Sequence, residues 1–152
     1  MNGSQIYHAL KTNPVTSTVF RDVRAANRLP AGDEQWGAYV VNTDPDTLPG
    51  QHWVVLYYTR TTIHYFDSFG MEPTEIIQEN LEKTKALRGK CLRVHRRRIQ
   101  GYRNFCGLYC IYYILSLVSE SHTLDIFNDH LDFNDRLVFG TVSNLFPVNK
   151  ML

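Results

Sequence analysis

The stretch that decides the fold of this chain is its most apolar run, Cys106-Gly107-Leu108-Tyr109-Cys110-Ile111-Tyr112-Tyr113-Ile114-Leu115. The sequence stays apolar almost all round until Ser119, and this pattern predicts a central core helix over 106–118. Cys106 would lie in the first turn, at the positive end of the helix dipole and beside free backbone N–H groups. Both effects lower the pKa of a thiol and favour the thiolate. The run therefore indicates a nucleophilic cysteine at the start of a buried helix.

Segments upstream of this run read as β-strands that place two polar residues side by side. They are rich in Val, Ile, Tyr and Phe, are separated by turn formers, and cover 36–43, 53–59 and 62–69. The connection over 59–62 is short enough for a hairpin, so the last two strands should run antiparallel. His52 precedes one of these strands and Asp67 closes the apolar part of the other. We therefore expect the two side chains to be neighbours.

The remaining segments complete an α+β fold. Residues 73–87 predict an amphipathic helix, and residues 91–99 predict a strand that delivers Gln100 to its end. Residues 6–10 favour a short helix or an arm, 20–29 show roughly helical spacing, and 124–146 mix helical and irregular patterns before a polar tail. The expected architecture is a central mixed, mostly antiparallel sheet packed against the helix that begins at Cys106.

Composition indicates a single domain without a strong overall charge. With 152 residues, of which 43% are hydrophobic and 20% charged, we expect one domain over 1–152 and a monomer. A net charge of +1 gives no overall attraction to nucleic acid or to an anionic membrane. No apolar run reaches the roughly 18 residues that span a bilayer, and the first residues lack a secretory signal. Three cysteines form neither a disulfide framework nor a metal-type spacing with the histidines, so we expect no metal and a reducing, non-secretory environment.

Polar residues needed for nucleophilic cysteine catalysis follow one another as His52, Asp67, Gln100 and Cys106. The chemistry requires an imidazole to move a proton, a carboxylate to orient it, and hydrogen-bond donors for an oxyanion. Taken alone, a cysteine such as Cys106 is more often a small buried hydrophobe than a nucleophile. The motifs that surround the four residues are Val41-Asn42-Thr43, Gly50-Gln51-His52-Trp53, Tyr65-Phe66-Asp67-Ser68-Phe69-Gly70 and Cys106-Gly107-Leu108-Tyr109-Cys110.

From residue 36 to residue 118 these motifs resemble the adenovirus protease (adenain) and its relatives, the SUMO-deconjugating cysteine proteases. The resemblance implies a cysteine protease with Cys106 as nucleophile, His52 as general base and acid, and Asp67 as orienting carboxylate. Gln100 and the backbone N–H of Cys106 would form the oxyanion hole, and the chemistry would need no cofactor. The aspartate at 67 and the interval between Gln100 and Cys106 resemble those of the deconjugating branch. The residues around Asn42, Asp67 and Cys106 are more similar to those of the viral enzymes.

Three activities stay open. A viral maturation protease would cleave capsid or core precursor proteins after small residues such as glycine, in the host nucleus or cytoplasm and in the virion. The alternative with the same triad is an isopeptidase that removes ubiquitin-like modifiers, or an acetyltransferase effector. A diglycine-ended modifier fusion, a precursor peptide and acetyl-CoA would distinguish the three.

The resemblance also implies activators. Adenovirus proteases are activated by a short peptide that can form a disulfide with an enzyme cysteine, and Cys91 lies near that position. They use DNA as a second activator, which would engage Arg96, Arg97 and Arg98. The simpler interpretation of this basic run is a solvated strand edge, and a non-catalytic nucleic-acid-binding module is the alternative of another class. Cys110 is expected to be inert core filling, although a resolving thiol is conceivable.

Overall fold

A mixed β-sheet forms the centre of the computed structural model, which describes residues 1–49, 52–119 and 124–146. Within these residues the sheet has five strands in the order β1-β2-β3-β4-β5. Their bounds are β1 (Phe20–Ala25), β2 (Gly37–Asn42), β3 (Trp53–Tyr58), β4 (Thr62–Phe66) and β5 (Cys91–Val94). The pairs β2–β3 and β3–β4 are antiparallel, whereas β1–β2 and β4–β5 are parallel. The sheet is mixed, as predicted, but it is not mostly antiparallel, because only the two central pairs of the four are antiparallel.

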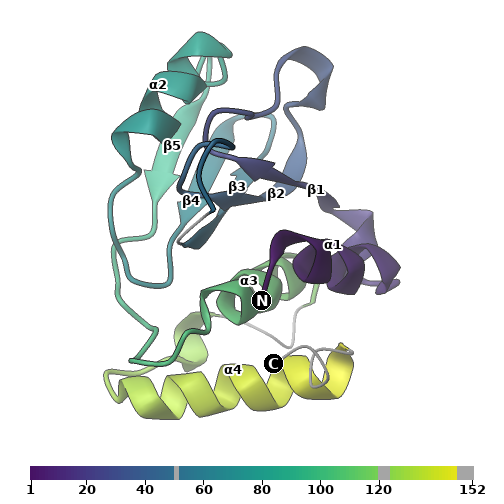
Figure 1. Cartoon of the computed structure of the whole chain (residues 1–152), viewed down its shortest axis with the longest axis vertical. Helices are drawn as coiled ribbons and strands as arrows, with labels where there is room; N and C mark the ends of the chain where they lie inside the picture. The colour runs from purple at the N-terminus through teal and green to yellow at the C-terminus, as the bar shows by residue number, and fades with distance from the viewer. Residues whose placement is uncertain (50–51, 120–123, 147–152) are drawn as a thin grey trace.

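Helices cover both faces of the sheet. Their bounds are α1 (Gly3–Thr12), α2 (Glu75–Lys83), α3 (Cys106–Val118) and α4 (Leu131–Leu145), with short 3-10 turns η1 (Thr16–Thr18), η2 (Gly32–Glu34) and η3 (Leu124–Ile126). Figure 1 shows α2 on one side of the sheet and α1 and α3 on the other, with α4 packed against α3 on the side away from the sheet. The predicted α+β fold, in which a core helix begins at Cys106, is confirmed.

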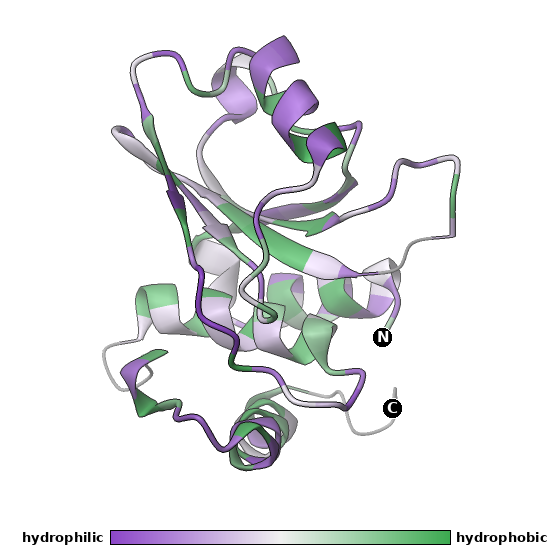
Figure 2. Cartoon of the chain, turned by 90° about the vertical axis from the view of Figure 1, so that its left-hand side faces the viewer, coloured by the Kyte–Doolittle hydropathy of each residue, from purple (hydrophilic) through white to green (hydrophobic). Residues whose placement is uncertain are grey.

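Alternation of side chains along the strands creates two hydrophobic layers. Val40 and Val55 face α3, whereas the next residues along their strands, Val41 and Leu56, face α2. Every residue of α3 from Cys106 to Leu115 is buried, so its uniformly apolar sequence matches a helix enclosed on all sides. Figure 2 shows hydrophobic colour along the central strands and hydrophilic colour on much of α2 and on the segment after β5.

Two predicted elements are wrong in type or length. Residues 20–29 do not form a helix, because Phe20–Ala25 is the strand β1 and pairs in parallel with β2. The strand predicted over 91–99 ends at Val94, since its neighbour β4 ends at Phe66 and offers no further partner. The chain then runs irregularly until the backbone N–H groups of Ile99 and Gln100 both donate to Ser68 O.

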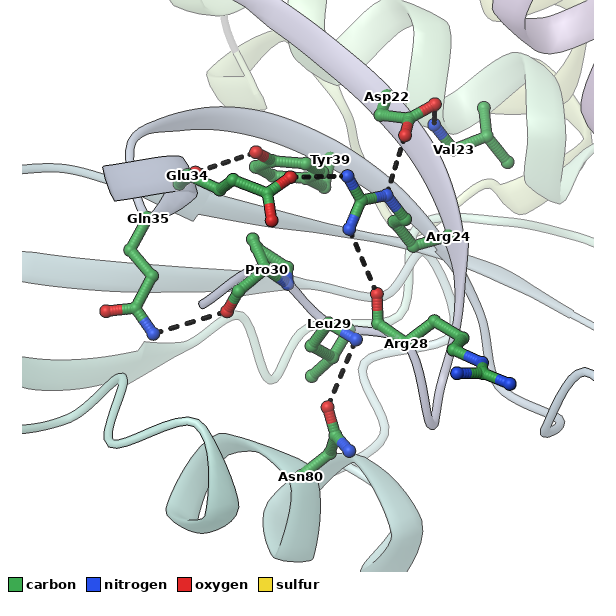
Figure 3. A network of polar contacts seen from close by, with 10 residues as sticks. All are labelled: Asp22, Val23, Arg24, Arg28, Leu29, Pro30, Glu34, Gln35, Tyr39 and Asn80. Carbon is green, nitrogen blue, oxygen red and sulfur yellow. Dashed lines mark hydrogen bonds and ion pairs between the residues drawn. The ribbon is translucent and has the colours of Figure 1, made fainter. Parts of the chain in front are cut away.

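A polar network fixes the connection between β1 and β2 (Figure 3). Arg24 donates to Asp22 and to Glu34, with N–O distances of 2.6 and 2.7 Å, and joins β1 to the turn before β2. The backbone N–H of Leu29 donates to Asn80 Oδ1 of α2 at 3.1 Å. These bonds satisfy polar groups that the connection would otherwise bury, and they tie it to α2.

Some of the sequence predictions fall outside the described residues. These are Gly50 and Gln51 of the motif before β3, the polar residues at 120 and 121, and the polar tail at 147–152. In the ranges that are described, no helix is both long enough and apolar enough to cross a bilayer.

Candidate active site

The β3–β4 hairpin brings His52 and Asp67 together. Val55 lies opposite Phe66 in the antiparallel register, so the residue before β3 and the residue after β4 meet at the same edge of the sheet. His52 Nε2 lies 2.7 Å from Asp67 Oδ1. The side chain of Asp67 is 4% exposed and that of His52 17%. A hydrogen bond shielded to this degree is stronger than one in water.

Phe69 holds this pair in place from the turn that follows β4. Its backbone N–H donates to Asp67 Oδ1 at 2.8 Å, so the same carboxylate oxygen receives two hydrogen bonds. Its ring stacks on the imidazole of His52, with centroids 4.9 Å apart and planes inclined by 25°. The stacking restricts rotation of the imidazole, and the backbone bond fixes the carboxylate.

Cys106 stands on the other side of the imidazole, in the first turn of α3. Because Asp67 engages Nε2 of His52, Nδ1 is the nitrogen left to face the thiol. Burial raises the pKa of Cys106, but hydrogen bonds with the His52 side chain and with backbone groups outweigh it, so the pKa lies below its ordinary value. Burial lowers the pKa of His52, whereas its hydrogen bonds to Asp67 and Cys106 raise it to about 9. Both shifts favour a thiolate–imidazolium pair.

Gln100 is positioned by the residue that follows Asp67. Ser68 Oγ donates to Gln100 Oε1, which leaves the amide nitrogen to donate. Nε2 of Gln100 donates to Arg103 O at 2.7 Å, and its second N–H has no bond to any other residue in the described ranges. The Gln100 side chain is buried and lines a pocket that Cys106 also lines. An amide N–H held in this way is suited to stabilise an oxyanion.

Gly70 permits the close packing that the turn after β4 requires. It has φ of +70°, and a Cβ atom there would lie 2.7 Å from the backbone of Arg97 and Arg98. Each residue of the Asp67-Ser68-Phe69-Gly70 motif thus contacts either the His52–Cys106 pair or the segment that carries Gln100. Of these four residues, only Asp67 has a role that was predicted from the sequence.

Helix α4 holds the segment that carries Gln100 in place. This role was not predicted from the sequence. Asp135 Oδ1 accepts hydrogen bonds from Gly101 N at 2.8 Å and from the Tyr109 hydroxyl at 2.7 Å. Asn134 Nδ2 donates to Ile99 O at 3.0 Å. Both polar side chains are buried. Two adjacent polar residues at buried positions of an amphipathic helix are the pattern that could have marked this role.

Two pockets meet at Cys106. The Trp53 pocket, of about 280 Å³, is lined by Met1, Asn2, Gly3, Asn42, Pro49, Trp53, Asn104, Cys106 and Gly107. The Arg98 pocket, of about 340 Å³, is lined by His52, Phe69, Arg98, Gln100, Gly101, Tyr102, Arg103, Asn104 and Cys106. Asn104 belongs to both, and its Oδ1 lies 3.9 Å from the Cys106 sulfur. Trp53 is partly buried against the core, its indole N–H donates to Met1 O, and the residue also lines the Trp53 pocket.

The arginines of the predicted basic run diverge. Arg96 pairs with Glu72, and Arg97 donates to Phe127 O and lies 3.7 Å from Asp129. Arg98 turns into the Arg98 pocket. The structure therefore does not bring the three side chains into one stripe.

The other two cysteines lie in unlike surroundings. Cys91 is an exposed free thiol at the start of the edge strand β5. Cys110 is a free thiol buried in α3, and burial raises its pKa well above the ordinary value, so it stays protonated. In the described part of the chain, no three His, Cys, Asp or Glu side chains cluster as a metal site would require.

Relatives of this chain come from viruses. A protein of Acanthamoeba polyphaga mimivirus that bears the name "Putative thiol protease" is 26% identical over 106 residues, which cover 64% of this chain and 35% of the relative. A cysteine protease of African swine fever virus is 33% identical over 99 residues, which cover 55% of this chain and 35% of the relative. No protein-family model matches the sequence.

A solved structure shares the fold. The crystal structure of the African swine fever virus protease aligns with a TM-score of 0.51 and 27% identity, over 72% of this chain and 44% of that one. The matched regions thus amount to about a third of the length of the curated relatives and less than half of the solved chain. In sequence and in fold, this chain is similar to cysteine proteases of viruses, as its motifs indicated.

Proposed function

We propose that this chain is a cysteine endopeptidase that uses Cys106, His52 and Asp67 as a catalytic triad. The observation that carries the proposal is the position of the His52 ring between the Asp67 carboxylate and the Cys106 thiol, at the start of a buried helix. Similarity to viral thiol proteases supports the same activity. Each residue of the triad then has a role that its surroundings suit.

In the proposed reaction the Cys106 thiolate attacks the carbonyl carbon of the scissile peptide bond. The oxyanion of the tetrahedral intermediate accepts hydrogen bonds from the backbone N–H of Cys106 and from Gln100 Nε2. The imidazolium of His52 donates its proton to the leaving nitrogen, the C–N bond breaks, and an acyl-enzyme remains. Neutral His52 then removes a proton from water, the resulting hydroxide attacks the thioester, and the thiolate leaves. Asp67 keeps the ring oriented in both steps.

The position of His52 sets the direction in which a substrate lies. The leaving nitrogen must receive its proton from His52, and His52 lines the Arg98 pocket but not the Trp53 pocket. The leaving side of the substrate therefore occupies the Arg98 pocket, and the acyl side occupies the Trp53 pocket. The indole ring of Trp53 and the residues at 1–3 narrow the second pocket, which favours small acyl-side residues such as glycine.

The substrates we propose are structural precursor proteins cleaved during virus particle maturation, in the host nucleus or cytoplasm and in the virion. The exposed thiol of Cys91 could form a disulfide with an activating peptide. DNA is the other proposed activator, and the basic residues expected to contact it, Arg96, Arg97 and Arg98, are all exposed. Both stand as proposals beside the triad, because the chemistry at Cys106 needs neither.

A cleavage assay tests the proposal. The wild type and Cys106→Ala are incubated with precursor proteins of the same genome, with and without DNA and candidate peptides. We expect cutting by the wild type and none by Cys106→Ala. Cys110→Ala is the matched control, since it removes a protonated, buried thiol of the same helix and should leave the cutting in place. Cutting that survives in Cys106→Ala would refute the assignment, and hydrolysis restricted to a diglycine-ended modifier fusion would identify an isopeptidase.

A further inference from the structure

The two pockets at Cys106 differ in charge. Two arginines, Arg98 and Arg103, line the Arg98 pocket together with His52, and no described acidic residue lines it. No lysine, arginine or carboxylate side chain of the described residues lines the Trp53 pocket. A substrate across the active site would therefore meet arginine side chains on one side only.

Arg98 is the better placed of the two arginines. Arg103 has a carboxylate near it, because its Nε lies 3.9 Å from Asp132. In the described ranges no carboxylate lies within pairing distance of Arg98, although the side chain is exposed. An exposed guanidinium in a pocket without an acidic neighbour is a ready partner for a carboxylate that arrives with a ligand.

The guanidinium of Arg98 is also held still. Nε donates to Gln100 O at 2.9 Å, and Nη2 donates to Gly101 O at 3.2 Å. The group lies 5.1 Å from the ring centre of Phe69 and 5.5 Å from that of Tyr102, a side chain that is 94% exposed. These contacts use two of the five N–H donors. A ligand that reaches the remaining donors meets a guanidinium that is already ordered, so binding avoids much of the entropy cost of ordering a free side chain.

We propose, on the basis of the protease function proposed above, that Arg98 selects substrates with an acidic side chain at one of the first two positions after the cut. Because His52 protonates the leaving nitrogen, the residues after the cut lie in the Arg98 pocket. Because Arg98 is fixed there without a carboxylate partner, Glu or Asp at those positions gains a charge-assisted hydrogen bond that Gln or Asn does not.

A nucleic-acid phosphate is the other anion that an arginine could bind, and the geometry disfavours it. A phosphate track needs several cations along one face. Arg96 is paired with Glu72, and Arg97 is directed to Phe127 O and Asp129, so neither side chain extends the charge of Arg98. Arg98 also lies in the same pocket as His52 and Cys106, where a substrate peptide must pass.

The test uses internally quenched peptides with Gly-Gly before the cut and Glu, Gln or Lys at each of the two positions after it. We expect the wild type to prefer Glu over Gln by about three- to ten-fold in kcat/KM, the scale of one partly exposed charge-assisted hydrogen bond. The preference should fall as salt is added. Arg98→Gln should cut the Glu and Gln peptides equally well, and Arg98→Lys should keep part of the preference. The ratio of kcat/KM for the Glu and Gln peptides is taken within one variant. It therefore cancels any general loss of activity that arises if the substitution disturbs the segment that carries Gln100.

Arg93→Gln is the matched control, because it removes the same charge from β5 and Arg93 does not line the pocket. It should keep the wild-type ratio. Equal cutting of the Glu and Gln peptides by the wild type, or a preference that survives in Arg98→Gln, would overturn the proposal. Inhibition by a short DNA duplex that disappears in Arg98→Gln, without any preference for Glu, would overturn it in favour of a phosphate site.

A Gly-Gly vinyl methyl ester separates this proposal from the protease function, because the probe has no amino-acid residue on the leaving side. Labelling of Cys106 by the probe together with equal cutting of all peptides would refute the role of Arg98 alone. Failure of the probe to label Cys106, together with failure to cut any peptide or precursor, would refute the protease function and the role of Arg98 with it.

Discussion

Replacement of Asp67 by asparagine isolates the charge that stabilises the thiolate–imidazolium pair. An asparagine side chain has nearly the same shape, and its Oδ1 can still accept the hydrogen bond from Phe69 N. The negative charge beside His52 Nε2 is lost. Burial of the imidazole, which lowers its pKa, remains. We therefore expect the pKa of His52 to fall and the pKa of Cys106 to rise.

The magnitude follows from the pKa of His52. This pKa is raised from 6.5 to about 9, and Asp67 and Cys106 are the groups that raise it. The shift of about 2.5 units corresponds to roughly 3 kcal/mol, at 1.36 kcal/mol per unit. Burial lowers this pKa and Cys106 shares in raising it, so the value gives the order of magnitude of the Asp67 contribution. We expect the thiolate form of Cys106 at pH 6.5 to decrease by about ten- to a hundred-fold in Asp67→Asn.

Alkylation by iodoacetamide measures the thiolate without any knowledge of the substrate. The rate is followed between pH 5 and 10, and peptide mass spectrometry separates Cys106 from the exposed thiol of Cys91. Asp33→Asn is the charge-matched control, since Asp33 is exposed in η2, outside both pockets. Its profile should equal that of the wild type. An unchanged Cys106 profile in Asp67→Asn would refute the electrostatic coupling between the three residues.

Three further outcomes are expected. Ser68→Ala leaves Gln100 Oε1 buried without its donor and should lower kcat/KM about ten-fold. Iodoacetamide should still alkylate Cys106 at the wild-type rate. An equal loss in kcat/KM and in the alkylation rate would mean that Ser68 acts on the thiolate instead. Gly70→Ala should lower the free energy of unfolding by about 1–3 kcal/mol in urea denaturation. The reason is that φ is +70° and the new Cβ would lie 2.7 Å from the backbone of Arg97 and Arg98. An unchanged urea midpoint would show that the turn relaxes without cost. Wild-type kcat/KM should fall on the alkaline side with an apparent pKa of about 9 as His52 loses its proton, and a fall centred near 6.5 would show that the imidazole is not held in the charged form.

The local parts of the fold could be predicted from the sequence. The helix that begins at Cys106 could be predicted because a helix that is apolar on all sides is stable in water only when it is buried in a core. The neighbourhood of His52 and Asp67 was readable because a short hairpin forces the start of one strand beside the end of the next. Neither inference needs knowledge of residues that are distant in the chain.

Elements that depend on distant partners were not readable. β1 was interpreted as helical because its few apolar residues fit more than one period, and only parallel pairing with β2 makes it a strand. The length of β5 is set by where β4 ends. The hydrogen bond from Ser68 to Gln100 and the two that Asp135 accepts join residues at least 26 positions apart. No local pattern contains such contacts.

What the sequence by itself determined is the set of reactive groups and their order, because residue type and strand or helix period are local properties. What only the tertiary structure decided is that two pockets meet at these groups and that arginine side chains line one of them. Residues 95–104 follow no period, so the directions of Arg96, Arg97 and Arg98 depend on Glu72, on the segment before α4, and on the turn after β4. Packing between distant segments therefore decides that Arg98 lines the pocket beside His52, and packing is a property of the whole fold.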